Sequence, residues 1–177
     1  MEDLILVKPD ETYIDEIRNY RQEWLDNDDH SHGDSGLFKQ SDIVAWVKNC
    51  LLYEQEETKP NLEHVTGEQF MLIRKNDGRI LGMIALRHSL GEPDSYLSRH
   101  GGQIGYGVRF SERRKGYAKK MLILCLEKCR EIGLDKVLIC CDTDNEGSRK
   151  TILACGGRFD KLSITGDEID EQYWIGL

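Results

Sequence analysis

The segment that decides the fold reads Arg109-Phe-Ser-Glu-Arg-Arg-Lys-Gly-Tyr-Ala-Lys-Lys120, and the apolar run Met121-Leu-Ile-Leu-Cys-Leu126 follows it directly. Six of these twelve residues are Lys or Arg and one is acidic, whereas the chain of 177 residues has a net charge of −8. Gly116 and the apolar run after it indicate a turn that leads into a helix. Because first-turn amides and the helix dipole attract negative charge, the segment predicts a phosphate site.

The composition favours one globular domain, which we expect to span residues 1–177. No apolar run approaches the length of about 18 residues that suggests a membrane span, and no secretory signal pattern is present, so we expect a cytoplasmic protein without membrane contact. The six cysteines form no CxxC pair and are expected to be free thiols. The acidic balance argues against nucleic acid as a partner.

Periodicity and turn residues predict an α/β domain with a mixed sheet. The strands are expected at 3–8, 70–74, 80–87, 103–108, 137–141, 159–164 and 172–175. Helices are expected at 12–25, from Ser41-Asp42 to Leu51, from the basic turn to about residue 130, and from residue 145 to 155. The apolar strand 137–141 is predicted to be central and buried. Two glycines in strand 103–108 mark either a bulge or a close backbone approach.

Two motifs resemble those of the GNAT acyltransferase superfamily, whose members mostly acetylate amines with acetyl-CoA. Arg113-Arg-Lys-Gly-Tyr-Ala118 matches the family signature of Arg or Gln, two residues, Gly, one residue, then Gly or Ala. Asn145-Glu-Gly-Ser148 matches the Asn that opens the helix after the next strand. The resemblance covers nearly the whole chain. It implies a mostly antiparallel central sheet with helices on both faces, and strands ending at Val108 and Cys141 that splay apart to form the coenzyme A cleft.

The resemblance also implies which residues bind acetyl-CoA. Backbone amides of residues 113–118 would hold the pyrophosphate, backbone groups around Val108 would pair with the pantetheine arm, and two side chains would face the cofactor across the gap. The expected cofactor-binding residues are Val108, Arg109, Arg113, Arg114, Lys115, Gly116, Tyr117, Ala118, Asn145 and Ser148. For Asn145, simple capping of its helix is an alternative that can coexist with this role. No metal is expected.

The catalytic acid and base stay unassigned. Many family members carry a glutamate on the strand before the phosphate turn, but residues 101–108 contain no carboxylate. Many also carry a tyrosine seven residues after the helix-opening Asn, and Ile152 stands there. The candidates for moving protons are Tyr106, Asp142, His88, His100 and the acids of the loop 26–36.

The loop 26–36 is polar and contains Asp28, Asp29, His30, His32 and Asp34. Their spacing fits no zinc finger or calcium loop, and the neighbouring glycines and serines suit a mobile loop. In GNAT-like folds this loop borders the acceptor pocket, so its acids favour a cationic acceptor.

We therefore expect an acetyltransferase that moves an acetyl group from acetyl-CoA to a primary amine of a small molecule or peptide. A catalytically silent CoA-binding regulatory module is the alternative, and an RNA-binding domain using the basic turn is a third reading. The sequence does not decide between a monomer and a homodimer.

Overall fold

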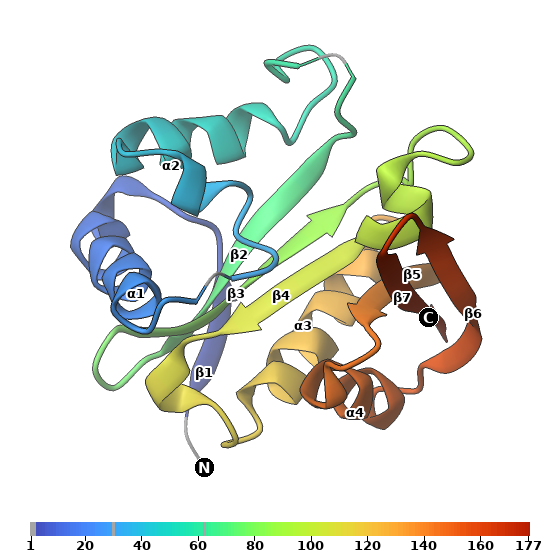
Figure 1. Ribbon diagram of the computed structural model, residues 1–177. Coiled ribbons are helices and arrows are strands. Elements are labelled where there is room, and N and C mark those ends of the chain that lie inside the picture. Colours follow the sequence, from blue (N-terminus) through green and yellow to red (C-terminus); the bar gives the residue numbers. More distant parts are fainter. Residues whose placement is uncertain (1–2, 30, 62) are drawn as a thin grey trace.

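The computed structural model describes residues 3–29, 31–61 and 63–177. Its strands are β1 (Leu4–Val7), β2 (Gly67–Arg74), β3 (Arg79–Arg87), β4 (Ile104–Val108), β5 (Lys136–Asp142), β6 (Arg158–Thr165) and β7 (Glu168–Gly176). Its main helices are α1 (Ile14–Asp26), α2 (Ile43–Leu52), α3 (Tyr117–Glu131) and α4 (Glu146–Ala154). This order confirms the predicted α/β class (Figure 1).

The strands form two antiparallel sheets that meet at β4 and β5. One sheet has the order β1-β2-β3-β4 and the other the order β5-β7-β6. Just before β4, the amide of Gln103 donates to the carbonyl of Leu138 at 2.8 Å, and its side-chain oxygen accepts from the Leu138 amide at 3.1 Å. Beyond this contact β4 and β5 belong to separate sheets, so the predicted splayed strands are confirmed (Figure 1).

Helices cover both faces of the four-stranded sheet, as predicted. Helices α1 and α2 pack on one face, and their Trp24 and Trp46 share a core with Met83 of β3. Helix α3 packs on the other face, where Leu81 of β3, Ile152 of α4 and residues of β5 and β7 complete a second core. The gap between β4 and β5 therefore lies between two layers that are each fixed by an apolar core.

The state of the cysteines and the character of the helices bear on two predictions made from composition. All six cysteines are free thiols, as predicted, and four of them are buried. Within the described ranges, none of the helices combines the length and the apolar character that crossing a membrane requires.

Strand β5 differs from its prediction in one respect. Val137, Leu138 and Ile139 are buried, as predicted for an apolar strand. However, β5 pairs with β7 on one side only and is the edge strand of its sheet. The reason is that β4 diverges from it after Gln103, so its other edge borders the gap rather than a hydrogen-bonded neighbour.

The loop between α1 and α2 packs on β4, so the expectation of a mobile loop is wrong for its second half. A Cβ added at Gly33 would overlap the carbonyl oxygen of Gly105, and one added at Gly105 would lie 3.3 Å from the Gly33 Cα. Gly107 faces the buried Ser31 in the same way. The two glycines of β4 therefore mark a close backbone approach rather than a bulge.

Candidate functional site

A cleft of about 1140 Å³ lies where β4 and β5 diverge. The α1–α2 loop, β4, the start of α3, the end of β5, the start of α4 and the start of β7 all contribute to its walls. Eight of the ten residues predicted to bind the cofactor line it, namely Val108, Arg113, Arg114, Gly116, Tyr117, Ala118, Asn145 and Ser148. Arg109 and Lys115 do not belong to its lining.

The N-terminus of α3 opens into this cleft without a protein cap. Its cap residue Gly116 has a left-handed φ of 85°, no side chain caps the helix, and its first turn contains no acidic residue. A Cβ added at Gly116 would meet no protein atom within 4 Å. In the described part of the chain, the amides of Gly116, Ala118 and Lys119 have no acceptor. A helix start with open amides and free space is suited to an anion.

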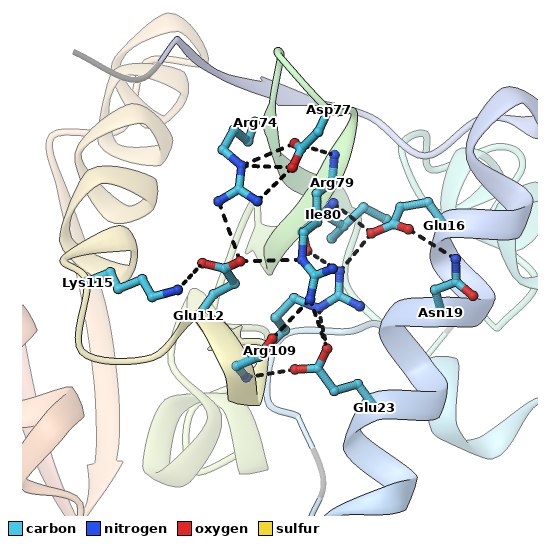
Figure 2. A network of polar contacts seen from close by, with 11 residues as sticks. Glu16, Asn19, Glu23, Arg74, Asp77, Arg79, Ile80, Arg109, Glu112 and Lys115 are labelled. Carbon is cyan, nitrogen blue, oxygen red and sulfur yellow. Dashed lines mark hydrogen bonds and ion pairs between the residues drawn. The ribbon is translucent and has the colours of Figure 1, made fainter.

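Arg109 is a correction to the predicted set, because its side chain turns away from the cleft (Figure 2). The residue is 2% exposed. Its Nη1 donates to Glu16 of α1 at 2.7 Å and its Nε donates to Glu23 at 2.9 Å. Nη1 also donates to the Ile80 carbonyl at 2.9 Å. The guanidinium therefore ties the basic turn to α1 and β3 and is not available to a phosphate.

Glu112, the one acid of the basic segment, is the centre of a second ion-pair group (Figure 2). The residue is buried, and its carboxylate lies 3.4 Å from both Arg74 Nη1 and Arg79 Nε. Lys115 Nζ donates to the same carboxylate at 2.8 Å. Lys115 thus shares its charge with Glu112, although half of its side chain is exposed.

The remaining cations stand at the mouth of the cleft. Arg113 pairs with Asp29 at 2.7 Å, donates to the Val108 carbonyl at 3.2 Å and stacks over Trp24 at 4.7 Å. Arg114 and Lys119 are exposed, line the cleft and make no ion pair among the described residues. Two cations therefore stay available beside the open amides.

Asn145 and Ser148 lie at the start of α4, on the wall across from β4. The Asn145 Oδ1 accepts the Ser148 amide at 3.0 Å, which is the capping role that the sequence left open. The Ser148 hydroxyl lies 2.9 Å from the hydroxyl of Tyr106 on β4, so this pair bridges the gap. Burial raises the pKa of Tyr106, which keeps its hydroxyl protonated at neutral pH.

The backbone of β4 offers hydrogen bonds to the gap. In an antiparallel pair, alternate residues direct both N–H and C=O toward the neighbouring strand. The Arg109 amide donates to the Leu81 carbonyl of β3 at 2.9 Å. Val108, one residue earlier, therefore directs its amide away from β3, toward the cleft that it lines.

The comparison with known families agrees with this geometry. A family profile described as an acetyltransferase (GNAT) domain matches residues 3–158. The chain belongs to the GNAT acetyltransferase family. A search of curated proteins gives no significant match.

Solved GNAT acetyltransferases share the fold of this chain. The microcin C7 self-immunity acetyltransferase MccE, in complex with acetyl-CoA and AMP, has a TM-score of 0.73 at 16% identity, over 100% of this chain and 94% of that one. The ribosomal-protein-S5-alanine acetyltransferase from Vibrio fischeri has a TM-score of 0.70 at 14% identity, over 99% and 94%. The ribosomal L7/L12 α-N-protein acetyltransferase RimL, in complex with coenzyme A, has a TM-score of 0.69 at 14% identity, over 98% and 94%. At these identities the likeness shows the fold alone.

The other end of the cleft in this GNAT acetyltransferase holds a polar cluster around His100. His100 is buried in a π-helical turn, Leu97–Gly101, between β3 and β4. Its Nδ1 lies 2.6 Å from Asp170 Oδ2, and its Nε2 lies 2.8 Å from Thr165 Oγ1. Burial raises the pKa of Asp170, with Asp142 adding to the rise and His100 opposing it. This cluster joins the β4 side of the cleft to the β6–β7 hairpin.

Glu168 extends the cluster at the exposed rim of the cleft, with a carboxylate oxygen 3.8 Å from His100 Nδ1. The ligand atoms of His100, Glu168 and Asp170 all lie within 4.8 Å of one another, a spacing that a metal ion can also use. Within this group the imidazole and the Asp170 carboxylate satisfy each other by hydrogen bonding.

The other proton-transfer candidates separate into two groups. Tyr106, Asp142 and His100 line the cleft, whereas His88 does not. The His88 ring instead contacts the Thr66 hydroxyl at 3.0 Å and Glu68 at 3.5 Å. His88 is therefore part of the structure around β2 and not of the site.

The loop acids are largely engaged within the protein. Asp29 pairs with Arg113, and the buried Asp34 accepts the Leu37 amide at 2.8 Å. Among the described loop residues, no group with metal-ligand spacing is found, while His30 lies outside the described residues. The attraction of a cationic acceptor by these acids stays a prediction, and Asp142 and Glu168 add two exposed carboxylates to the lining of the cleft.

Sequence reasoning missed Glu168, Asp170 and Arg87, all of which line the cleft. Strand β7 was expected at 172–175 but begins at Glu168, because the turn at Gly166 is shorter than expected. A signal was present, since polar residues at 168, 170 and 172 recur with the period of two that places them on one face of a strand.

Proposed function

We propose that residues 1–177 act as one acetyltransferase domain that moves an acetyl group from acetyl-CoA to a primary amine. The observation that carries the proposal is the uncapped N-terminus of α3, with Arg114 and Lys119 beside it, at the mouth of the cleft between β4 and β5. Membership of the GNAT family and a polar cluster at the other end of the same cleft favour an enzyme over a silent CoA-binding module.

In this proposal the basic turn holds the pyrophosphate of acetyl-CoA. The amides of Gly116, Ala118 and Lys119 would donate to phosphate oxygens, and the cations of Arg114 and Lys119 would add charge. Backbone groups around Val108 would pair with the pantetheine arm like a neighbouring strand. Asn145 and Ser148 would close the opposite wall. Arg109 and Lys115 would act through the ion pairs that fix the turn, and not by contact.

The acetyl transfer itself needs a neutral amine, an oriented thioester and a group that stabilises the oxyanion. The ammonium would pass a proton to the carboxylate–imidazole cluster, with the exposed Asp142 as its first acceptor and Asp170 and His100 behind it. The amine nitrogen would then attack the carbonyl carbon, and the C–S bond would break. The Val108 amide would donate to the oxyanion. The protonated Tyr106 hydroxyl would donate to the leaving thiolate and take up the second proton that the nitrogen loses as the amide forms.

The test is acetyl-CoA binding followed by turnover, measured on the same protein. Calorimetry with EDTA present should give a complex without added metal, and a ligand at about a hundred times its Kd should stabilise the fold by roughly 2.7 kcal/mol. Release of the coenzyme A thiol with a panel of primary amines should then reveal an acceptor. Binding without turnover across the panel would support the silent module, and absence of binding would refute both readings.

The polar cluster is tested by Asp142→Asn and His100→Asn. Both variants should bind acetyl-CoA normally. Their turnover should fall by about a hundredfold, the size of effect expected for loss of a general base. Asp144→Asn, an exposed neighbour in the cleft wall, is the matched control and should keep most of the activity. Equal losses of turnover in Asp142→Asn and Asp144→Asn would show that Asp142 is not the proton acceptor.

A further inference from the structure

Arg87 lines the cleft without a carboxylate partner. In the described part of the chain, no Asp or Glu oxygen lies within 4.0 Å of its guanidinium. Its Nη1 donates to the carbonyl oxygens of Gly101 and Gly102, at 3.4 and 3.2 Å. Since a guanidinium has five N–H donors, most of its hydrogen-bonding capacity is left for a ligand.

Two arginines of the basic segment differ from Arg87 because they have carboxylate partners. Arg109 is paired with two glutamates and Arg113 with Asp29. Among the described residues, the Nε and Nη2 atoms of Arg87 form no hydrogen bond, and neither atom is fully buried. Both therefore remain accessible from the cleft that Arg87 lines. Burial by the surrounding protein lowers the pKa of Arg87. A charge that is largely removed from water and has no counterion favours binding of an anion.

The position of Arg87 places that anion beside the proposed amine site. Alternate residues of a strand share a face, so Arg87 lies on the same face of β3 as Met83, which packs against α1 and α2. Helix α3 packs on the opposite face of the sheet. The carbonyls that hold the guanidinium, at Gly101 and Gly102, follow His100 directly in the chain.

We infer that the acceptor is an amino-carboxylate, such as an amino acid, whose carboxylate binds Arg87 while its amine faces the cluster of Asp142 and Glu168. This inference rests on the proposed acetyl transfer and names its substrate class. One guanidinium matches one carboxylate, because its two parallel N–H groups fit the two oxygens. The cations Arg114 and Lys119, unpaired among the described residues, lie beside the open amides of α3, where the proposed cofactor phosphates bind, so Arg87 is the arginine proposed for the acceptor.

The experiment compares amino acids with their own carboxamides as acceptors, by release of the coenzyme A thiol. The two acceptors of a pair share the amine and the side chain and differ in the carboxylate. The native protein should use the carboxylate form with a kcat/KM at least about tenfold higher, since a hydrogen bond to a charged group corresponds to roughly ten- to a hundredfold. Arg87→Gln should abolish this preference by lowering the rate for the acids and sparing the carboxamides.

Arg99→Gln is the matched control, because it removes the same charge from the turn Leu97–Gly101, whose Gly101 carbonyl accepts from Arg87. Arg99 pairs with Asp94 on the surface and does not line the cleft. The preference for acids should survive in this variant, and Arg87→Lys should keep part of it. Melting temperature and acetyl-CoA affinity should stay unchanged in all three variants, which separates loss of recognition from loss of fold.

Equal use of acids and carboxamides by the native protein would overturn the inference while leaving acetyl transfer intact. Equal losses for both forms in Arg87→Gln would also overturn it, because they would indicate a structural role. If no acceptor turns over, calorimetry of N-acetyl amino acids and N-acetyl amino acid amides on the protein loaded with coenzyme A decides. The acids alone should bind, and only with Arg87 present; failure of the acids to bind would overturn the inference separately from the proposed function.

Discussion

The two halves of the basic segment differ in charge and in surroundings, since residues 109–112 hold one arginine and one glutamate and residues 113–120 hold five cations and no acid. In the half from Arg109 to Glu112, every charged side chain is paired with partners from α1 or from the β2–β3 hairpin. In the half from 113 to 120, Arg114 and Lys119 have no ion pair among the described residues and face the cleft. A cluster of positive charge in a sequence therefore becomes a candidate binding site only where the fold leaves it unpaired.

The backbone amides show the same division. The amides of Ser111, Glu112 and Arg113 donate to Glu23 Oε1 at 2.7 Å, the Arg109 carbonyl at 3.0 Å and the Phe110 carbonyl at 3.3 Å. Those of Gly116, Ala118 and Lys119 have no acceptor in the described ranges. The first half of the segment thus stabilises the fold, and we propose that the second half binds the ligand.

Among variants of the basic segment, Arg109→Met should cause the largest change, a loss of folding stability. Removal of the guanidinium leaves Glu16 and Glu23 without their common partner, and breaking such a pair should lower the free energy of unfolding by about 3 kcal/mol. Urea denaturation measures this loss. Arg18→Met, which removes an exposed pair with Asp15 on the same helix, is the control and should cost less than about 1 kcal/mol. If Arg109→Met leaves stability unchanged and weakens acetyl-CoA binding, Arg109 contacts the cofactor after all.

Gly116→Val should weaken acetyl-CoA binding by at least about tenfold, because the branched side chain would fill the space above the open amides. Gly133→Val is the matched control at the other end of α3. Gly133 also has a left-handed φ, 79° against 85°, and open space around it, so both variants carry the same backbone strain. Calorimetry should show normal affinity for Gly133→Val. Similar affinity losses in both variants would mean that strain in α3 explains the effect.

Glu23 gives the first half of the segment a dependence on pH. Although burial opposes it, the Ser111 amide and Arg109 hold the pKa of the Glu23 carboxyl below its usual value. A lowered pKa in the folded state adds stability that is present above the unfolded pKa and is lost as pH falls. The native protein should therefore lose stability between about pH 5 and 3, and Glu23→Gln should show a flatter profile there. An identical slope in both proteins would show that this carboxylate does not contribute.

Arg114→Ala should have the smallest effect of the series. The side chain is one exposed cation beside several amides, so its loss should weaken acetyl-CoA binding by no more than about fivefold. The loss should shrink as salt rises, because exposed charges are screened. A larger loss than that of Gly116→Val in calorimetry would show that side chains, and not amides, carry the site.

The sequence predicted the parts of the site that depend on local signals. Gly116 and Asn145 both begin helices as expected, and Gly133 ends α3, because capping and left-handed glycine are properties of a few neighbouring residues. The order of strands and the splayed pair also followed from periodicity together with the family resemblance. These features need no knowledge of distant contacts.

Contacts between distant residues were beyond the sequence. Arg109 was expected at the phosphate because its partners, Glu16 and Glu23, lie more than eighty residues earlier. His100 was one of several candidates until the fold placed Asp170 at 2.6 Å from it, across seventy residues. Arg87 gave no local signal at all, since an unpaired guanidinium is recognised only once its neighbours are known.

The most direct measurement is hydrogen exchange of individual backbone amides, followed by NMR with and without saturating acetyl-CoA. The account predicts that exchange at Gly116, Ala118 and Lys119 slows by at least about tenfold, while Glu112 and Arg113, which already have acceptors, change little. Saturated binding that leaves residues 116–119 unprotected, or that protects 109–112 instead, would contradict the division of the basic segment into a structural half and a binding half.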